Sequence, residues 1–266
     1  MIGRTSSAYA TDPGERVPAR GGAPGFDPVA GIEHDAPCVA SAHFTPDLLR
    51  FLRELRSHND RDWFNANKER YERSVRDPFL RFVADLRPRL KQISPHFVAD
   101  PKPVGGSMMR IYRDTRFSKD KTPYKTAVAA QFWHARGKDG ATPAFYLRLQ
   151  PGDSGVGAGI WRPEPGALQR IRKAIVADPK TWAKIKGGRE FKSTCGMAGE
   201  SLKRPPPGFD AEHPFIEDLK RKDFVAMAGF SEKDACAPDF LDRFAGVCEA
   251  AAPLMKFLTT AVGLKW

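Results

Sequence analysis

The spacing of apolar residues changes twice along this 266-residue chain, and the two changes limit the folds open to it. Between residues 44 and 93 apolar side chains recur every three or four positions, which is the spacing of one buried helix face. After Ser94-Pro95 the spacing shortens to two, as in a half-buried strand, and from about residue 165 helical spacing returns. Runs of strands flanked by runs of helices predict an α+β fold rather than a doubly wound sheet.

The helical pattern has recognisable boundaries. We expect the first helix to begin at Thr45-Pro46, because threonine is a good N-cap and proline suits the first helical position. Asp77-Pro78 is expected to divide the apolar pattern that runs on to Ile93, since proline obstructs a continuous helix.

The strand pattern predicts four short consecutive strands, at residues 104–113, 125–134, 143–150 and 155–161. A further edge strand is expected at residues 224–227. Short consecutive strands favour an antiparallel meander, so we expect an antiparallel sheet of about four or five strands packed against N-terminal and C-terminal helices.

The first 41 residues differ from the rest of the chain in composition and charge. They contain six Gly and five Pro, with no periodic large apolar residues, and are predicted to form a disordered tail before a single α+β domain at 42–266. The net charge of this tail is −2, so the rest of the chain carries +13, and the sum is the formal net charge of +11. No apolar run approaches the roughly 18 residues of a membrane helix, and residues 1–10 do not resemble a secretory leader, so we expect a cytoplasmic protein without a membrane partner.

Positive charge is densest in the segment 110–125, RIYRDTRFSKDKTPYK, with Lys102 just upstream. Guanidinium groups can grip phosphate or carboxylate in two places, lysines add mobile charge, and hydroxyl groups add hydrogen bonds. The candidate anion ligands in this segment are Arg110, Arg113, Arg116, Ser118, Lys119, Lys121 and Lys125. In the alternative interpretation the segment is a self-paired connection, in which Asp114 and Asp120 neutralise neighbours while Phe117 and Tyr124 anchor the loop.

The string RDTRFSKDKTPYK, the Trp63-Phe64 pair in NDRDWFNANKERY, and the later GAGIWRP together resemble the domain-of-unknown-function 2461 family, a bacterial and fungal group. The resemblance covers roughly residues 44–228. It implies one conserved unit but no activity, cofactor or catalytic residue.

Alternation along the predicted strands separates an apolar face from a polar one. The polar face would carry Arg110 and Tyr112, then Tyr146, Arg148 and Gln150, then Gly157, Gly159 and Trp161. Arginines beside aromatic rings suit a flat or phosphorylated ligand, and strand glycines permit its close approach. Alternatively, Gly157 and Gly159 only accommodate the rings of Tyr112 and Tyr146.

Other chemistry has little support in the sequence. The six histidines show no metal-ligand spacing, and no metal site is expected. No P-loop, nucleophile elbow or dinucleotide fingerprint is present, and no cofactor is predicted. The four cysteines, at 38, 195, 236 and 248, lack close pairing, and Asp60 and Asp62 are explained by the helix dipole.

Three functional hypotheses follow. The leading one is that the loop and the polar sheet face bind a phosphate-bearing small molecule or nucleotide, with catalysis unassigned and Asp114 as the acid or base candidate, because neighbouring cations favour its ionised form. The second is nucleic-acid binding without chemistry, although no helix-turn-helix, zinc-finger or RNP pattern supports it. The third is a structural or interaction protein in which ion pairs within the charged loop stabilise the fold.

Overall fold

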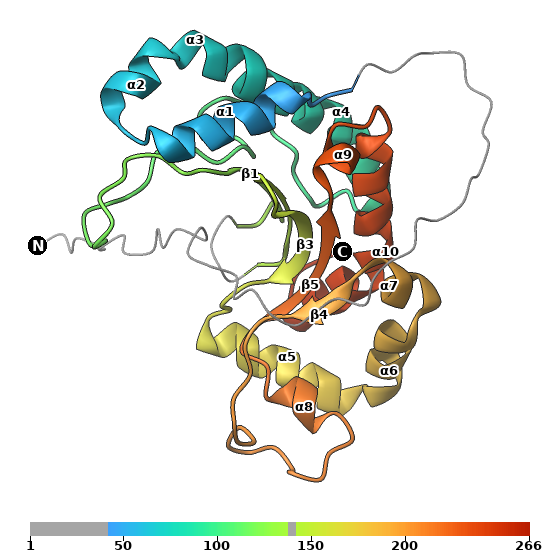
Figure 1. Cartoon of the computed structure of the whole chain (residues 1–266). Helices are drawn as coiled ribbons and strands as arrows, with labels where there is room; N and C mark the ends of the chain where they lie inside the picture. Colours follow the sequence, from blue (N-terminus) through green and yellow to red (C-terminus); the bar gives the residue numbers. More distant parts are fainter. Residues whose placement is uncertain (1–41, 138–141) are drawn as a thin grey trace, which may run out of the picture.

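A computed structural model describes residues 42–137 and 142–266 (Figure 1). The predicted N-terminal tail, residues 1–41, lies outside the described residues. The helices are α1 (Pro46–Ser57), α2 (Arg61–Ala66), α3 (Lys68–Tyr71), the π-helical segment η1 (Glu72–Arg76), α4 (Asp77–Ile93), α5 (Pro165–Ala177), α6 (Pro179–Gly187), α7 (Arg189–Thr194), α8 (Ile216–Leu219), α9 (Glu232–Ala235) and α10 (Phe240–Ala261). The strands are β1 (Val128–Trp133), β2 (Ala144–Leu149), β3 (Ser154–Ile160), β4 (Gly196–Ala198) and β5 (Phe224–Phe230).

The strands form one antiparallel sheet in the order β1-β2-β3-β5-β4. The register aligns Phe132 with Phe145, and Phe145 with Ala158. In Figure 1 helices α1–α3 lie above the sheet, α5, α6 and α8 lie below it, and α10 runs beside it. The predicted α+β class and the antiparallel sheet of about five strands are thus confirmed.

The apolar face of the sheet is the core of the protein. Phe132, Phe145, Leu147 and Val156 are fully buried, and α10 packs against β3 and α4. N-terminal and C-terminal helices meet on this face. The ring of Phe244 in α10 contacts the ring of Phe82 in α4 and that of Phe132 in β1. Because successive side chains of a strand point to opposite faces, the polar residues and glycines of these strands lie on the other face of the sheet.

The helix boundaries agree with the sequence at the start of α1 and differ further on. Helix α1 begins at Pro46 with Thr45 as the N-cap residue, although the threonine side chain makes no capping hydrogen bond. The expected boundary at Asp77-Pro78 is where α4 begins, with Pro78 in its first turn, where a missing N–H is tolerated. It is not a break in the chain direction, because the backbone stays helical from the π-helical segment η1 into α4.

Two strand predictions also need correction. Residues 104–113 do not form a strand. Segment 96–109 instead makes separate bridges to the outer edge of β1, such as Met108 with Ala130. Pro101 and Pro103 cannot donate ladder hydrogen bonds, and a Cβ on Gly106 would lie 2.3 Å from a backbone oxygen, so a tight turn interrupts the pairing.

The strand predicted at the edge, 224–227, is β5, and it lies inside the sheet between β3 and β4. The three-residue strand β4 covers its far side.

Below the sheet, one buried carboxylate joins α6 to α8. Asp218 accepts hydrogen bonds from the Trp182 indole at 2.9 Å, the Lys186 ammonium at 2.8 Å and the Arg221 guanidinium at 3.3 Å. Its side chain is only 3% exposed, so these donors replace water around the charge. Within residues 42–137 and 142–266, no helix combines the length and apolar character needed to cross a membrane.

Candidate functional site

The cationic segment 110–125 is a hairpin-like loop closed at its base. Arg113 N donates to Pro123 O at 2.8 Å, and Lys125 N donates to Ile111 O at 2.8 Å. Tyr112 and Tyr124 form a bridge between these two hydrogen bonds. We call residues 110–125 the Arg/Lys loop.

Helix α2 and the turn before it hold the loop in place. The Asn59 side-chain amide donates to Tyr124 O at 2.9 Å and accepts from Tyr124 N at 3.0 Å. The ring of Phe64 stacks on that of Tyr124, with centroids 4.1 Å apart. The anchor is therefore Tyr124, whereas Phe117, which the self-paired interpretation also makes an anchor, is 94% exposed.

Part of the loop charge is neutralised within the loop. Arg113 bonds the Asp120 carboxylate and the Thr122 hydroxyl, and the Thr122 backbone N–H donates to Asp120 at 2.9 Å. The backbone of Thr122 and the guanidinium of Arg113 lower the pKa of Asp120 from its ordinary 3.8 to about 2. Lys121 Nζ donates to Thr115 O at 2.9 Å.

A second ion pair lies at the exposed tip of the loop. Arg116 donates to both oxygens of Asp114, at 2.9 and 2.6 Å, and its guanidinium and backbone N–H lower the pKa of Asp114 to about 2. A carboxylate with that pKa stays ionised across the neutral range, which suits an ion pair better than proton transfer near pH 7.

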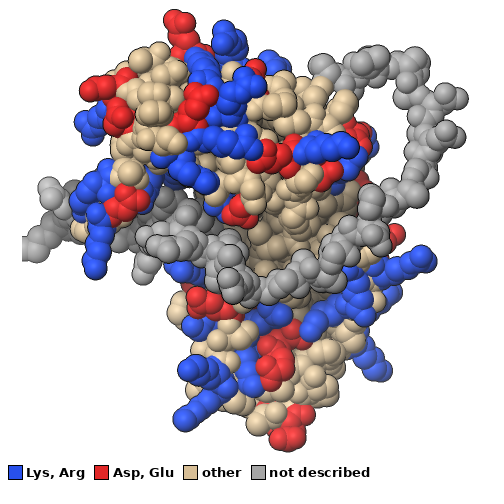
Figure 2. All heavy atoms as spheres, in the orientation of Figure 1, with Lys and Arg blue, Asp and Glu red and all other residues tan. Residues whose placement is uncertain are grey.

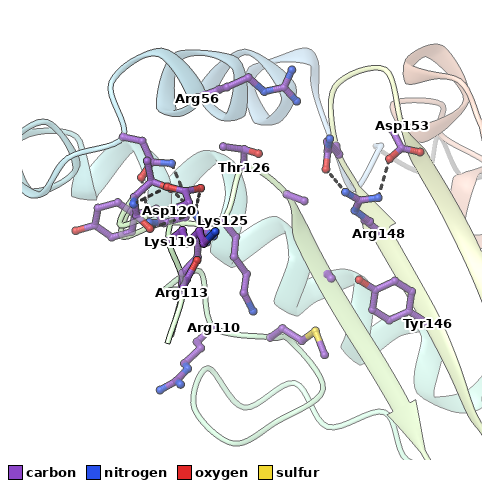
Figure 3. A pocket seen from close by; sticks show the side chains of 18 of the residues that line it. Arg56, Arg110, Arg113, Lys119, Asp120, Lys125, Thr126, Tyr146, Arg148 and Asp153 are labelled. Carbon is purple, nitrogen blue, oxygen red and sulfur yellow. Dashed lines mark hydrogen bonds and ion pairs between the residues drawn. The ribbon is translucent and has the colours of Figure 1, made fainter. Parts of the chain in front are cut away.

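The Arg/Lys loop faces β2 across a cavity of about 860 Å³ (Figure 3). The loop supplies one wall, and Tyr146 and Arg148 of β2 supply the opposite one, with Lys125 between them. Arg56, from the last turn of α1, lies above this space. The remaining lining residues are Asn59, Met109, Arg110, Arg113, Phe117, Ser118, Lys119, Asp120, Thr122, Tyr124, Thr126, Ala127, Ala129, Gln150 and Asp153.

The cavity carries a strong excess of positive charge. Six Lys or Arg side chains line it against two carboxylates. Arg148 is held by Asp153 at 2.7 Å and by Gln150, but the side chains of Arg56, Arg110 and Lys119 make no ion pair or hydrogen bond within the part of the chain that the structure describes. Figure 2 shows Lys and Arg on the loop at the left and on the helices above it, interspersed with acidic side chains.

Seven of the residues predicted from sequence as ligand-binding meet in this cavity, namely Arg110, Arg113, Ser118, Lys119, Lys125, Tyr146 and Arg148. The others do not line it. Asp114, Arg116 and Lys121 lie on the loop with the partners given above, and Tyr112 packs on Phe64 and Tyr124 while 52% exposed.

The two glycines lie further along the polar face. A Cβ on Gly159 would lie 2.0 Å from Phe224 O of β5, so this glycine permits close strand approach and not the seating of a tyrosine ring. A Cβ on Gly157 would lie 3.0 Å from Met227 Sδ and 3.7 Å from Tyr146 Cβ. Gly157 therefore accommodates both side chains.

Sequence reasoning missed Arg56 and Asn59. Arg56 lies on an exposed position of an amphipathic helix, where a basic residue is ordinary. Asn59 stands in a break between two helical patterns, and only its contact with Tyr124 shows its role.

No group of three or more His, Cys, Asp or Glu side chains with metal-binding geometry occurs within residues 42–137 and 142–266. Burial raises the pKa of Cys195 to about 11, and burial also raises the pKa of Cys248 well above its ordinary value. Neither thiol is therefore activated as a nucleophile.

Comparison with protein families matches residues 47–257 to the family described as conserved hypothetical protein (DUF2461). The chain belongs to this family, as the motifs predicted. Comparison with curated proteins and with solved structures finds no match.

Proposed function

We propose that this DUF2461 chain binds a phosphate-bearing small molecule or nucleotide in the cavity between the Arg/Lys loop and β2. The observation that carries the proposal is the charge of the lining, with six cations and two carboxylates around one space. Like charges held together in a fold repel one another, and an anionic ligand relieves that repulsion.

The cations that line the cavity differ in whether their side chains are paired with other residues. Arg113 and Arg148 are oriented by neighbouring oxygens, as is useful for a forked contact with phosphate. Arg56, Arg110 and Lys119 have no such partner among residues 42–137 and 142–266, so their charge is available to a ligand. A volume near 860 Å³ lies within the usual range for small-molecule sites.

The proposal concerns binding, and no reaction is assigned. Asp114, the acid or base candidate from sequence, lies outside the lining and is paired with Arg116. Asp120 and Asp153 line the cavity, but each is paired with an arginine.

The test is thermal unfolding with inorganic pyrophosphate and nucleoside diphosphates as probes. Specific binding at 100 times Kd stabilises a protein by about 2.7 kcal/mol, or roughly 5–10 °C for a chain of this size. We expect Arg110→Ala/Lys119→Ala to unfold at or above the wild-type temperature without probe, and to lose the probe-induced rise.

The matched control is Arg81→Ala/Lys91→Ala, which removes two exposed cations of α4 that lie outside the cavity lining. It should keep the full probe-induced rise. The proposal fails if no probe raises the unfolding temperature of wild type, or if the two double variants lose the rise equally.

A single-stranded nucleic acid is the second candidate, and the exposed ring of Phe117 favours it. This ring lines the mouth of the cavity with the Arg116 guanidinium 5.8 Å from its centroid, and exposed aromatics beside cations stack on bases. Binding that strengthens with oligonucleotide length and falls steeply with salt would support this candidate, whereas saturable nucleotide binding with a shallow salt slope favours the small ligand.

A further inference from the structure

A second, smaller hollow adjoins the cationic cavity on the polar face of the sheet. Its volume is about 120 Å³, and it shares Met109 and Tyr146 with the larger space. We call this hollow the glycine cleft, because the backbone of Gly157 and Gly159 borders it.

The remaining walls of the glycine cleft are mainly apolar. Trp161, Val225 and Met227 contribute side chains, and none of the residues that line the cleft is charged. An apolar cavity of about 150 Å³ in another protein takes up one benzene molecule, so a space near 120 Å³ suits a single ring and not a fused pair. The glycine cleft is therefore a small apolar site that adjoins the cationic cavity.

Two hydrogen-bonding groups in the cleft have no partner among the described residues. The Gln131 side-chain amide and the Trp161 indole N–H make no hydrogen bond with any residue in 42–137 or 142–266. Gln131 is aligned with Tyr146 across β1 and β2, and Tyr146 with Gly157 across β2 and β3, so the amide lies in the same cross-strand row as the glycine. An amide offers both donors and an acceptor, which is what the edge of a nucleobase requires.

We propose that the glycine cleft receives the ring of the ligand whose phosphates occupy the cationic cavity, and that the ligand is a pyrimidine nucleotide. This inference rests on the proposed function and adds the identity of the ring to it. The ring contacts the side chains of Trp161 and Met227, which line the cleft together with the glycine backbone, and its polar edge lies at Gln131. The excess of four positive charges around the larger cavity suits more than one phosphate group.

The experiment is calorimetric titration of the wild-type protein with UDP, CDP, ADP, GDP and inorganic pyrophosphate. The four nucleotides share the ribose and the diphosphate, so differences among them report on the base, whereas pyrophosphate reports on the diphosphate alone. We expect UDP or CDP to bind about tenfold or more tightly than pyrophosphate, and ADP and GDP to gain less than either.

Two variants test the cleft itself. Gln131→Met keeps the length of the side chain but removes its hydrogen bonds, and Gly157→Ala adds a methyl group to the floor. Each should weaken pyrimidine diphosphate binding about fivefold to tenfold and leave pyrophosphate binding unchanged. Gln169→Met, an exposed glutamine of α5, is the matched control and should change neither.

The outcomes separate the two proposals. If pyrophosphate binds and no pyrimidine diphosphate binds more tightly, the cleft assignment is overturned while the cationic site stands. If purine diphosphates bind as tightly as pyrimidine diphosphates, the inference that the cleft accepts only a single ring is overturned. If Gln131→Met leaves the affinity for UDP and CDP unchanged, the proposed contact of the Gln131 amide with the base is overturned. If no probe binds, both proposals fail.

Discussion

Replacing Gly159 with alanine is expected to destabilise the sheet far more than the same change two residues earlier. Gly159 has a φ of +144°, which L side chains rarely adopt, and its added Cβ would lie 2.0 Å from Phe224 O and 2.8 Å from Val225 Cα. Both contacts are with the backbone of β5, which cannot move aside as a flexible side chain can.

The magnitude follows from these two terms. A residue held in a glycine-only region of backbone conformation costs on the order of 1–3 kcal/mol. Forcing one extra methyl group into a packed site costs about 1–3 kcal/mol more. We therefore expect Gly159→Ala to lower the free energy of unfolding by roughly 4 kcal/mol, which corresponds to roughly 8–16 °C in unfolding temperature.

Urea denaturation followed by tryptophan fluorescence measures this loss. Gly157→Ala is the matched control, because its nearest contact is the Met227 thioether at 3.0 Å, at the far end of a flexible side chain. Gly229→Ala, whose Cβ would meet nothing within 4 Å, is a second control. Both should stay within about 1 kcal/mol of wild type. A Gly159→Ala protein that also stays within 1 kcal/mol would refute the reasoning.

Three further predictions concern buried and paired groups. Asp218→Ala should lower the free energy of unfolding by about 3–5 kcal/mol in urea denaturation, because it leaves three donors without their buried acceptor; a loss under 1 kcal/mol would contradict this. Cys195, whose pKa burial raises to about 11, should react with iodoacetamide at pH 8 far more slowly in the native than in the unfolded protein, as peptide mass spectrometry can measure; equal rates would count against its burial. Asp114 and Asp120, with pKa values lowered from 3.8 to about 2, should stay ionised at pH 4, so that their contribution to stability is present above that pH and is lost as the pH falls to 2; carboxyl NMR titration midpoints near 3.8 would show that the ion pairs do not form in solution.

Much of the fold follows from local patterns in the sequence. The two periods of apolar residues distinguish helices from strands because each period places one set of side chains on one face. The same alternation correctly places Tyr146 and Arg148 on the face opposite the buried side chains of Phe145 and Leu147. The family that the sequence resembles is also the one whose model matches residues 47–257.

Other features depend on partners that are distant in the chain. Residues 104–113 have the alternation of a strand but do not form one, because a turn at Gly106 interrupts the hydrogen bonds to β1 and Tyr112 pairs with Tyr124 instead. Strand β5 lies inside the sheet because β4, from a separate part of the chain, covers it.

In the candidate site, too, some features follow from the local sequence and others depend on the tertiary structure. The sequence by itself determined that the loop is cationic and that β2 presents a tyrosine and an arginine on one face, since composition and side-chain alternation are local properties. Only the tertiary structure decided which cations are neutralised, which face the cavity, and that Arg56 joins them. The physical reason is that an ion pair or a cavity depends on distances between atoms, and the packing of Tyr124 against Phe64 and Asn59 sets where the loop lies relative to the sheet.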